Sequence, residues 1–135
     1  MIFVDTGFFL GALDSRDELH PRAAAWADAV RKPLITTEYV LVEAINACSG
    51  TGERGKARQT FDLVTSPAFG RYLPASPKLF RGGWDLFVDR PDKDWSLTDC
   101  ISFHVMQSEG ITQALAYDHH FEQAGFEALL RRDPS

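Results

Sequence analysis

Two aspartates follow apolar segments that have the composition of buried strands. Asp5 comes directly after Ile2–Val4, and Asp118 comes directly after Ala114–Tyr117. The carboxyl ends of parallel strands meet at one edge of a sheet, where ligands bind. If the two strands are neighbours, we expect both carboxylates to point into one crevice. The alternative is that each aspartate only caps the helix that follows it, since aspartate is a favoured N-cap.

Glu43 is a third candidate because its neighbours in the sequence are apolar. It stands in the segment Tyr39–Cys48, which is apolar nearly all round and predicts a largely buried helix. A buried glutamate is costly unless it is paired or binds a cation. Asn46 shares its helix face, so we expect this face to line a polar cavity. The alternative is that Glu43 pairs with an arginine or reaches solvent.

Asp99 is the fourth candidate, and it has a structural explanation of its own. The spacing of Ser96 and Asp99 resembles a capping box at the start of a helix. A carboxylate there is also stabilised by the helix dipole. Helix N-termini are places where loops converge on a crevice, so capping and function can coexist at this residue.

Carboxylates that meet in one pocket repel one another, and without a counterion some stay protonated at neutral pH. Hard oxygen ligands of this kind suit Mg²⁺ or Mn²⁺. One or two such ions can hold a phosphodiester, stabilise charge at the phosphorus and activate a water. The sequence therefore predicts a metal-dependent nuclease whose catalytic and metal-binding residues are Asp5, Glu43, Asp99 and Asp118.

The elements that must position these residues alternate along the chain. Short apolar runs predict strands at residues 2–4, 34–36, 69–74, 111–117 and 126–130. Helical patterns with caps or breakers cover residues 6–13, 21–30, 37–48, 53–65, 77–88, 98–107 and 119–124, with Gly82 and Gly83 weakening the fifth. Such alternation implies a parallel sheet with helices on both faces.

Charge and composition agree with this interpretation. The 135 residues have the usual size of one domain, residues 1–135, and 44% apolar against 24% charged residues exclude disorder. There are 14 Lys and Arg against 19 Asp and Glu, a net charge of −5. Proteins that grip nucleic acid by bulk electrostatics are normally basic, so bound metal ions would have to offset the phosphate charge here.

The sequence also indicates a cellular setting. No apolar run approaches the ~20 residues that a membrane span needs, and Met1–Val4 lacks the basic leader of a signal peptide. Cys48 and Cys100 lie in apolar helical patterns and are interpreted as small core residues of a reduced, cytoplasmic protein.

Four motifs together resemble a known family. They are Phe3–Thr6, Thr37–Glu43, Leu97–Ser102 and Ala114–Phe121. Each is weak alone, but in this order and spacing the chain resembles a PIN-domain ribonuclease, most closely the toxin of VapBC-type toxin–antitoxin modules. The resemblance covers essentially the whole chain.

The resemblance implies a three-layer α/β/α sandwich with a central parallel sheet of about five strands. It also implies Mg²⁺- or Mn²⁺-dependent endonuclease action on RNA. Asp5, Glu43, Asp99 and Asp118 fall on the family's acidic quartet, and Thr6 falls on the hydroxyl that follows its first aspartate. Members are commonly homodimers, and toxin members are silenced by an antitoxin whose tail enters the acidic groove.

The chain departs from the family at one point. A Thr or Ser often stands one or two residues before the last aspartate of the family, where this sequence has Ala116 and Tyr117. Any hydroxyl there must come from Tyr117. His119 and His120 follow the aspartate, and either is a proton shuttle or an exposed bystander at a helix start.

Other residues keep two interpretations each. Arg54, Lys56 and Arg58 either flank the groove and touch phosphates or form a solvated helix face. Phe8 and Phe9 are expected to divide between the core and a partner subunit. The remaining aromatic residues near a loop are interpreted as core or interface, and they are Trp84, Phe87 and Trp95.

Three other functions remain as alternatives to the toxin. One is a PIN-type nuclease that processes RNA without an antitoxin, and another is a catalytically silent PIN-like module that only binds a partner. The third is a phospho-acceptor module, which requires paired acids near the first strand and a lysine after a late strand. Asp5 stands alone and no lysine follows Lys93, which disfavours the third.

Overall fold

The computed structural model describes residues 1–135, in which strands and helices alternate as predicted. The strands are β1 (Ile2–Val4), β2 (Leu34–Thr37), β3 (Gly70–Leu73), β4 (Gln113–Leu115) and β5 (Glu127–Ala128). The helices are α1 (Thr6–Leu13), α2 (His20–Ala29), α3 (Glu38–Ala47), α4 (Arg54–Thr65), α5 (Pro77–Asp89), α6 (Leu97–Glu109) and α7 (His119–Gln123), followed after β5 by a 3₁₀ turn at Leu129–Arg131. None of these helices has the length and apolar character needed to cross a membrane.

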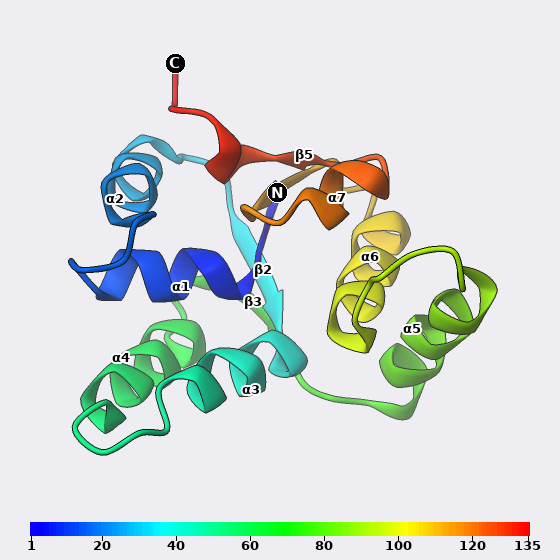
Figure 1. Ribbon diagram of the computed structural model, residues 1–135, viewed down its shortest axis with the longest axis horizontal. Helices are drawn as coiled ribbons and strands as arrows, with labels where there is room; N and C mark the ends of the chain where they lie inside the picture. The colour runs from blue at the N-terminus through cyan, green and yellow to red at the C-terminus, as the bar shows by residue number, and fades with distance from the viewer.

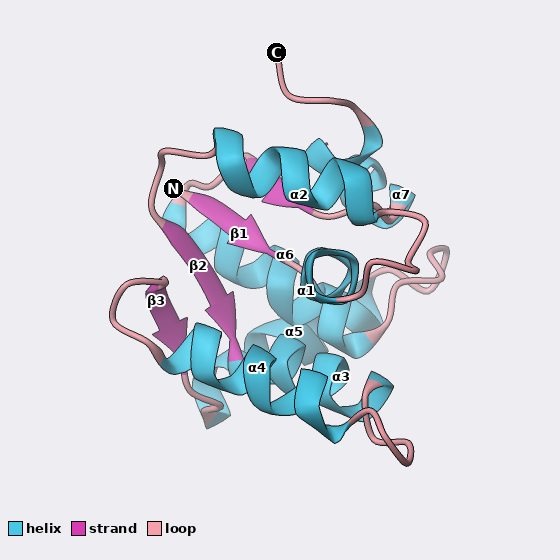
Figure 2. Cartoon of the chain, turned by 90° about the vertical axis from the view of Figure 1, so that its left-hand side faces the viewer, coloured by secondary structure: helices cyan, strands magenta, loops and turns pink.

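The five strands form one parallel sheet in the order β3-β2-β1-β4-β5. The chain runs outward from β1 through β2 to β3, then returns to the other side of β1 for β4 and ends at β5 (Figures 1 and 2). The strand order therefore reverses between β1 and β4. In open α/β sheets, ligands bind at the carboxyl edge beside such a reversal.

Helices cover both faces of the sheet. Figure 1 shows α1, α2 and α4 on one side of the strands and α5 and α6 on the other. The prediction of a three-layer α/β/α sandwich with five parallel strands is confirmed.

One apolar core joins the sheet to the helices. β1 is buried along its whole length, as expected for a strand covered on both faces. Phe103 packs edge-on against Phe121, with ring centroids 4.9 Å apart. Phe8 and Phe9 are both buried in this core, so the expectation that one of them faces a partner subunit is wrong. Both cysteines are free and buried, as predicted.

Two strands are shorter than the apolar pattern predicted. β4 ends at Leu115, and β5 has two residues before the chain turns. Leu129 and Leu130 are almost fully buried, and Leu130 donates its N–H to the carbonyl of Ala116 at 3.1 Å. A short apolar run does not distinguish a strand from a buried turn, which explains the error.

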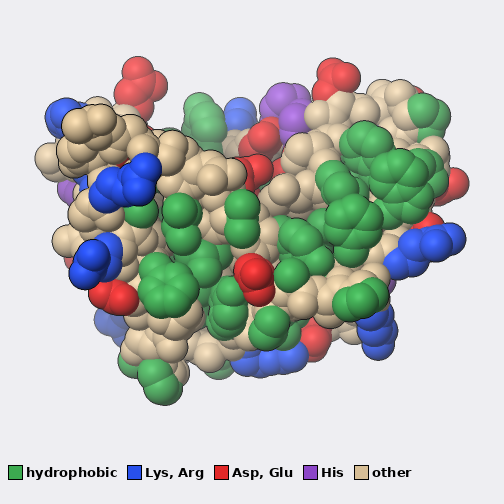
Figure 3. All heavy atoms as spheres, turned by 90° about the horizontal axis from the view of Figure 1, so that it is seen from below, with side chains coloured by type: hydrophobic (Ala, Val, Ile, Leu, Met, Phe, Trp, Pro, Cys, Tyr) green, Lys and Arg blue, Asp and Glu red, His purple; other side chains and the backbone are tan.

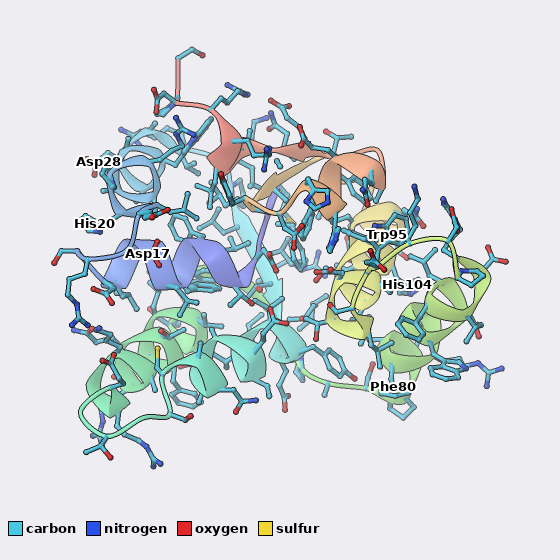
Figure 4. All side chains as sticks on the ribbon, viewed as in Figure 1. Asp17, His20, Asp28, Phe80, Trp95 and His104 are labelled. Atoms are coloured by element: carbon cyan, nitrogen blue, oxygen red, sulfur yellow. The ribbon has the colours of Figure 1, made fainter.

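The glycine pair in α5 permits close helix packing. A Cβ on Gly83 would lie 2.2 Å from Cγ1 of Ile101 in α6, and one on Gly82 would lie 2.4 Å from the ring of His104. Figure 4 labels His104 at this contact between the two helices. The helix continues through both glycines because the packing compensates for their low helix propensity.

Candidate active site

Asp5 lies at the strand-order reversal, between β1 and α1. Its backbone N–H donates to the carbonyl of Leu115 at 3.1 Å, which ties the ends of β1 and β4 together. The side chain is 8% exposed and makes no capping hydrogen bond. Its Oδ1 atom is buried without a hydrogen-bond partner. The interpretation of Asp5 as only a helix cap is therefore wrong.

The surroundings of Asp5 disfavour its charged form. Burial, together with smaller contributions from the nearby carboxylates of Asp99, Glu43 and Asp118, raises the pKa of the Asp5 carboxyl to about 8. Backbone hydrogen bonding by Thr6 acts in the opposite direction and is too weak to compensate. A cation bound beside this carboxyl would favour its ionised form.

Asp99 combines capping with a place in the acidic cluster. Ser96 caps α6 by accepting from the N–H of Asp99 at 3.0 Å, and the carboxylate of Asp99 accepts from the N–H of Ser96 at 3.2 Å. The predicted capping box is confirmed. Burial raises the pKa of Asp99, and the charge of Asp118 adds to this effect. A carboxylate used only for capping would not face a second carboxylate.

Asp118 caps α7 and lies beyond the end of its strand. Because β4 ends at Leu115, the expectation that Asp118 directly follows the strand is wrong. Its Oδ1 accepts from the N–H of His120 at 3.0 Å, so the capping role is confirmed. The side chain is 41% exposed, which leaves oxygen atoms open to a ligand.

Glu43 is exposed, contrary to the expectation of a buried helix face. Only one face of α3 is buried, at Val40, Leu41 and Ala44, and Glu43 and Asn46 are on the outer side. The alternative that Glu43 reaches solvent is therefore correct. Even so, Glu43 belongs to the cluster, because Oγ1 of Thr6 donates a hydrogen bond to its Oε1. Asn46 does not line the cavity.

A cavity of about 430 Å³ opens over these side chains. Its polar walls come from the start of α1, from α3, from the segment between β4 and α7, and from the C-terminal turn. The polar residues that line it are Asp5, Thr6, Glu43, Tyr117, Asp118, His119 and Arg131. Asp99 does not line this cavity. His120 links it to Asp118, which does line the cavity, and its charge acts on Asp5. The predicted acids thus converge at the carboxyl edge from four separate parts of the chain.

His120 is the residue that the sequence pattern undervalued. Its Nδ1 lies 3.1 Å from Oδ2 of Asp99 and 3.2 Å from Oδ1 of Asp118. Carboxylates only accept hydrogen bonds, so the Nδ1–H group donates to them. The side chain is 18% exposed, whereas His119 is 61% exposed. The interpretation as an exposed bystander is wrong for His120, whereas His119 is exposed and lines the cavity.

The basic cluster on α4 does not belong to the cavity. Lys56 pairs with Asp14 and Glu53, both at 2.9 Å, while Arg54 and Arg58 are exposed. None of the three lines the acidic cavity. The interpretation as a solvated helix face is favoured over contacts to phosphate.

The donor set fits a divalent cation. The oxygen atoms of the four carboxylates are the hard ligands that Mg²⁺ and Mn²⁺ prefer. The buried Oδ1 of Asp5 has no hydrogen-bond partner, whereas buried polar atoms are normally hydrogen-bonded, and this fits a cation ligand. Fold and site together define an α/β protein with a cluster of carboxylates at its strand-order reversal.

Comparison with known proteins identifies the family. The model of the PIN domain matches residues 2–127. The chain therefore belongs to the PIN-domain family, and the resemblance inferred from the four motifs is confirmed.

Two relatives of known name are similar over nearly the whole chain. The 23S rRNA-specific endonuclease VapC20 of Mycobacterium tuberculosis, in strains CDC 1551 / Oshkosh and ATCC 25618 / H37Rv, is 30% identical over 129 residues, which cover 93% of this chain and 95% of the relative. The crystal structure of M. tuberculosis VapC20, titled a sarcin–ricin loop cleaving toxin, matches with a TM-score of 0.88 and 26% identity. This match covers 95% of the present chain and 98% of the other.

Proposed function

We propose that the protein is a divalent-metal-dependent endoribonuclease, the toxin of a type II toxin–antitoxin module. The observation that carries the proposal is the buried Asp5 carboxyl, which has an unpartnered oxygen and lies close to three further acids. Membership of the PIN family and similarity to an endonuclease toxin support the same activity. Residues 1–135 act as one domain in this proposal.

Four side chains would hold the cation, Mg²⁺ or Mn²⁺. They are Asp5, Glu43, Asp99 and Asp118. When bound, the ion supplies positive charge for the phosphodiester and a water that is easier to deprotonate. Thr6 orients Glu43 through its hydroxyl, and His120 holds Asp99 and Asp118 at a fixed separation. The buried position of Asp5 excludes water from one side of the site.

Ribosomal RNA is the first substrate to test, and an antitoxin is the expected partner. The relative VapC20 is named for its action on 23S rRNA, and its structure is titled as that of a toxin. The two buried, unpaired thiols support a place in the reducing cytoplasm. A PIN nuclease that processes RNA without an antitoxin would have the same site and differ only in its partner.

We also propose a homodimer that buries the outer face of α5. Phe80, Trp84 and Phe87 recur along this helix at a spacing that places them on one side, and they are 47%, 43% and 39% exposed. In the view of Figure 3, apolar side chains gather on the right-hand side of the molecule, over α5. Surface patches of this kind mark protein contacts. Sedimentation of the Trp84→Glu variant against the wild type tests the proposal, with a shift to monomer expected.

The nuclease is tested by incubating the purified chain with ribosomal RNA in Mg²⁺, in Mn²⁺ and in EDTA. Cleavage is expected with either metal and not in EDTA, and the Asp5→Asn variant is expected to be inactive. Equal cleavage by the wild type and Asp5→Asn contradicts the assignment of the site. Calorimetric titration with Mn²⁺ separates the enzyme from a silent scaffold, because a scaffold has no need of tight metal binding.

A further inference from the structure

Tyr117 is an exposed aromatic residue at the rim of the acidic cavity. It lies between β4 and α7, one residue before Asp118, and is 45% exposed. Most other aromatic side chains near the sheet edge, such as Phe9, Phe103 and Phe121, are fully buried. Tyr117 lines the cavity together with Asp5, so an exposed ring stands directly beside the proposed catalytic carboxylates.

Arg131 is held against this ring by three interactions. Its guanidinium lies 4.9 Å from the ring centroid of Tyr117. Its Nη1 donates to the backbone carbonyl of Tyr117 at 2.9 Å, and its Nε pairs with Glu122 at 3.1 Å. Arg131 is also the only lysine or arginine that lines the acidic cavity. A fixed cation and an aromatic ring therefore form one wall of an otherwise acidic site.

The ring of Tyr117 also borders a second cavity on the α1–α2 side. This cavity of about 710 Å³ shares Tyr117 and Leu19 with the acidic one. Its remaining walls include three acids against one arginine, and these are Asp17, Glu18, Asp133 and Arg22. Figure 4 labels Asp17 in this region, beside α1. A phosphate is disfavoured in such surroundings, whereas an uncharged base carries no penalty of that kind.

We propose that Tyr117 and Arg131 form a nucleotide-binding subsite of the nuclease. Arg131 contacts a phosphate next to the one that is cleaved, and the exposed part of the Tyr117 ring stacks on the adjoining base. The inference rests on the proposed function and extends it to how an acidic protein retains single-stranded RNA. Proteins that bind single strands combine cationic contacts with aromatic stacking in this way, because every base has a π-face.

The subsite makes different predictions for its two residues. Loss of stacking weakens binding by roughly 10-fold and is independent of salt. Loss of one phosphate contact lowers the slope of log affinity against log salt by about 1. Tyr117→Ala is therefore expected to weaken RNA binding with an unchanged salt slope, and Tyr117→Phe to bind as before. Arg131→Gln is expected to weaken binding with a shallower slope.

The experiment measures binding of a fluorescein-labelled, mixed-sequence single-stranded RNA 12-mer by anisotropy, in Mg²⁺, with all variants in the Asp5→Asn background to prevent cleavage. Two exposed residues on α4 provide matched controls: Phe61→Ala, at 49% exposure, and Arg58→Gln. A series of the same RNA with single abasic positions tests stacking without changing the ring. At one position of the RNA, removal of the base is expected to weaken binding to the protein that keeps Tyr117. The same abasic RNA is expected to bind the Tyr117→Ala variant as tightly as the intact RNA does.

Two results overturn the subsite. One is Tyr117→Ala binding as tightly as Phe61→Ala, and the other is an abasic series with no position that depends on Tyr117. These results leave the nuclease proposal intact, because that proposal is judged by metal-dependent cleavage alone. Conversely, cleavage by Asp5→Asn at the wild-type rate refutes the nuclease assignment whatever the RNA affinities are.

Discussion

The two ends of α1 each carry an aspartate, and the two carboxyl groups behave in opposite ways. Asp5 at the start has a buried oxygen without a hydrogen-bond partner, and burial raises its pKa to about 8. Asp14 at the end pairs with Arg16 at 3.1 Å and with Lys56 at 2.9 Å. Hydrogen bonds from Arg16 and Lys56 hold the pKa of Asp14 well below its usual range.

Asp5 is therefore a carboxylate that needs a ligand, whereas Asp14 is already neutralised. Around Asp14, Lys56 also pairs with Glu53, and Arg16 lies 3.6 Å from the same glutamate, so the charges balance within the chain. Around Asp5, the charges that raise its pKa are the carboxylates of Asp99, Glu43 and Asp118. Residue type alone thus does not mark a functional carboxylate, whereas a strongly perturbed pKa does.

The largest expected effect is on catalysis. Asp5→Asn is expected to lower the rate of metal-dependent RNA cleavage at least about 100-fold, because a charged ligand to the cation is lost. Asp14→Asn is expected to cleave within about 2-fold of the wild type, since Asp14 is outside the acidic cavity. Initial rates at saturating Mg²⁺ measure both. Similar losses in the two variants contradict the contrast between the two ends of the helix.

A smaller effect is expected on metal affinity when His120 is changed. His120→Ala is expected to weaken Mn²⁺ binding about 10-fold, because groups that orient metal ligands typically contribute this much. His120→Asn is expected to restore most of the affinity, since its amide N–H can take the place of the Nδ1–H donor. Calorimetry on each variant measures the affinity.

His119→Ala is the control for this prediction. Its side chain is exposed and lies 3.5 Å from Asp118, so its removal is expected to change the affinity less than 3-fold. Equal losses for His119→Ala and His120→Ala show that His120 has no special positioning role.

The raised pKa of Asp5 predicts a pH-dependent cost in stability without metal. The folded state keeps the Asp5 proton up to about pH 8, whereas the unfolded chain loses it near the ordinary aspartate pKa of 3.8. Stability from this group is therefore present below pH 4 and is lost as pH rises towards 8. Asp5→Asn, which carries no charge, is expected to raise the Tm in EDTA by several degrees at pH 8 and by less at pH 5.

Thermal unfolding of both proteins across this pH range tests the sign. A Tm difference that shrinks as pH rises contradicts it. Added Mn²⁺ is expected to stabilise the wild type more than Asp5→Asn, because only the wild type keeps the complete ligand set.

The smallest effect is expected at the balanced end of α1. Lys56→Met removes the ion pairs to Asp14 and Glu53, both partly exposed. Such pairs contribute little in water, so the Tm is expected to fall by no more than about 2 °C. Cleavage is expected to be unchanged. A loss of activity in Lys56→Met would indicate that the basic residues of α4 contact the substrate, and it would weaken the contrast with Asp5.

Parts of the site were predictable because they depend on local pattern. Asp5 follows a strand that is apolar throughout, and Asp99 has a capping partner three residues before it. Glu43 was found for a partly wrong reason: its helix has an outer face, so apolar neighbours did not mean burial. His120 was missed because its two acceptors come from α6 and from the turn before α7, and no spacing within one segment relates them.

By itself, the sequence determined the alternation of strands and helices, the parallel three-layer sheet and the four acids at its carboxyl edge. These follow from hydrophobic periodicity and capping, which act over a few neighbouring residues. Only the tertiary structure decided which carboxylates have counterions. It paired Asp14 with two cations, buried one oxygen of Asp5 without a hydrogen-bond partner, and brought Arg131 over Tyr117. Electrostatic interactions depend on distance through space and on burial, and neither is written in the order of the residues.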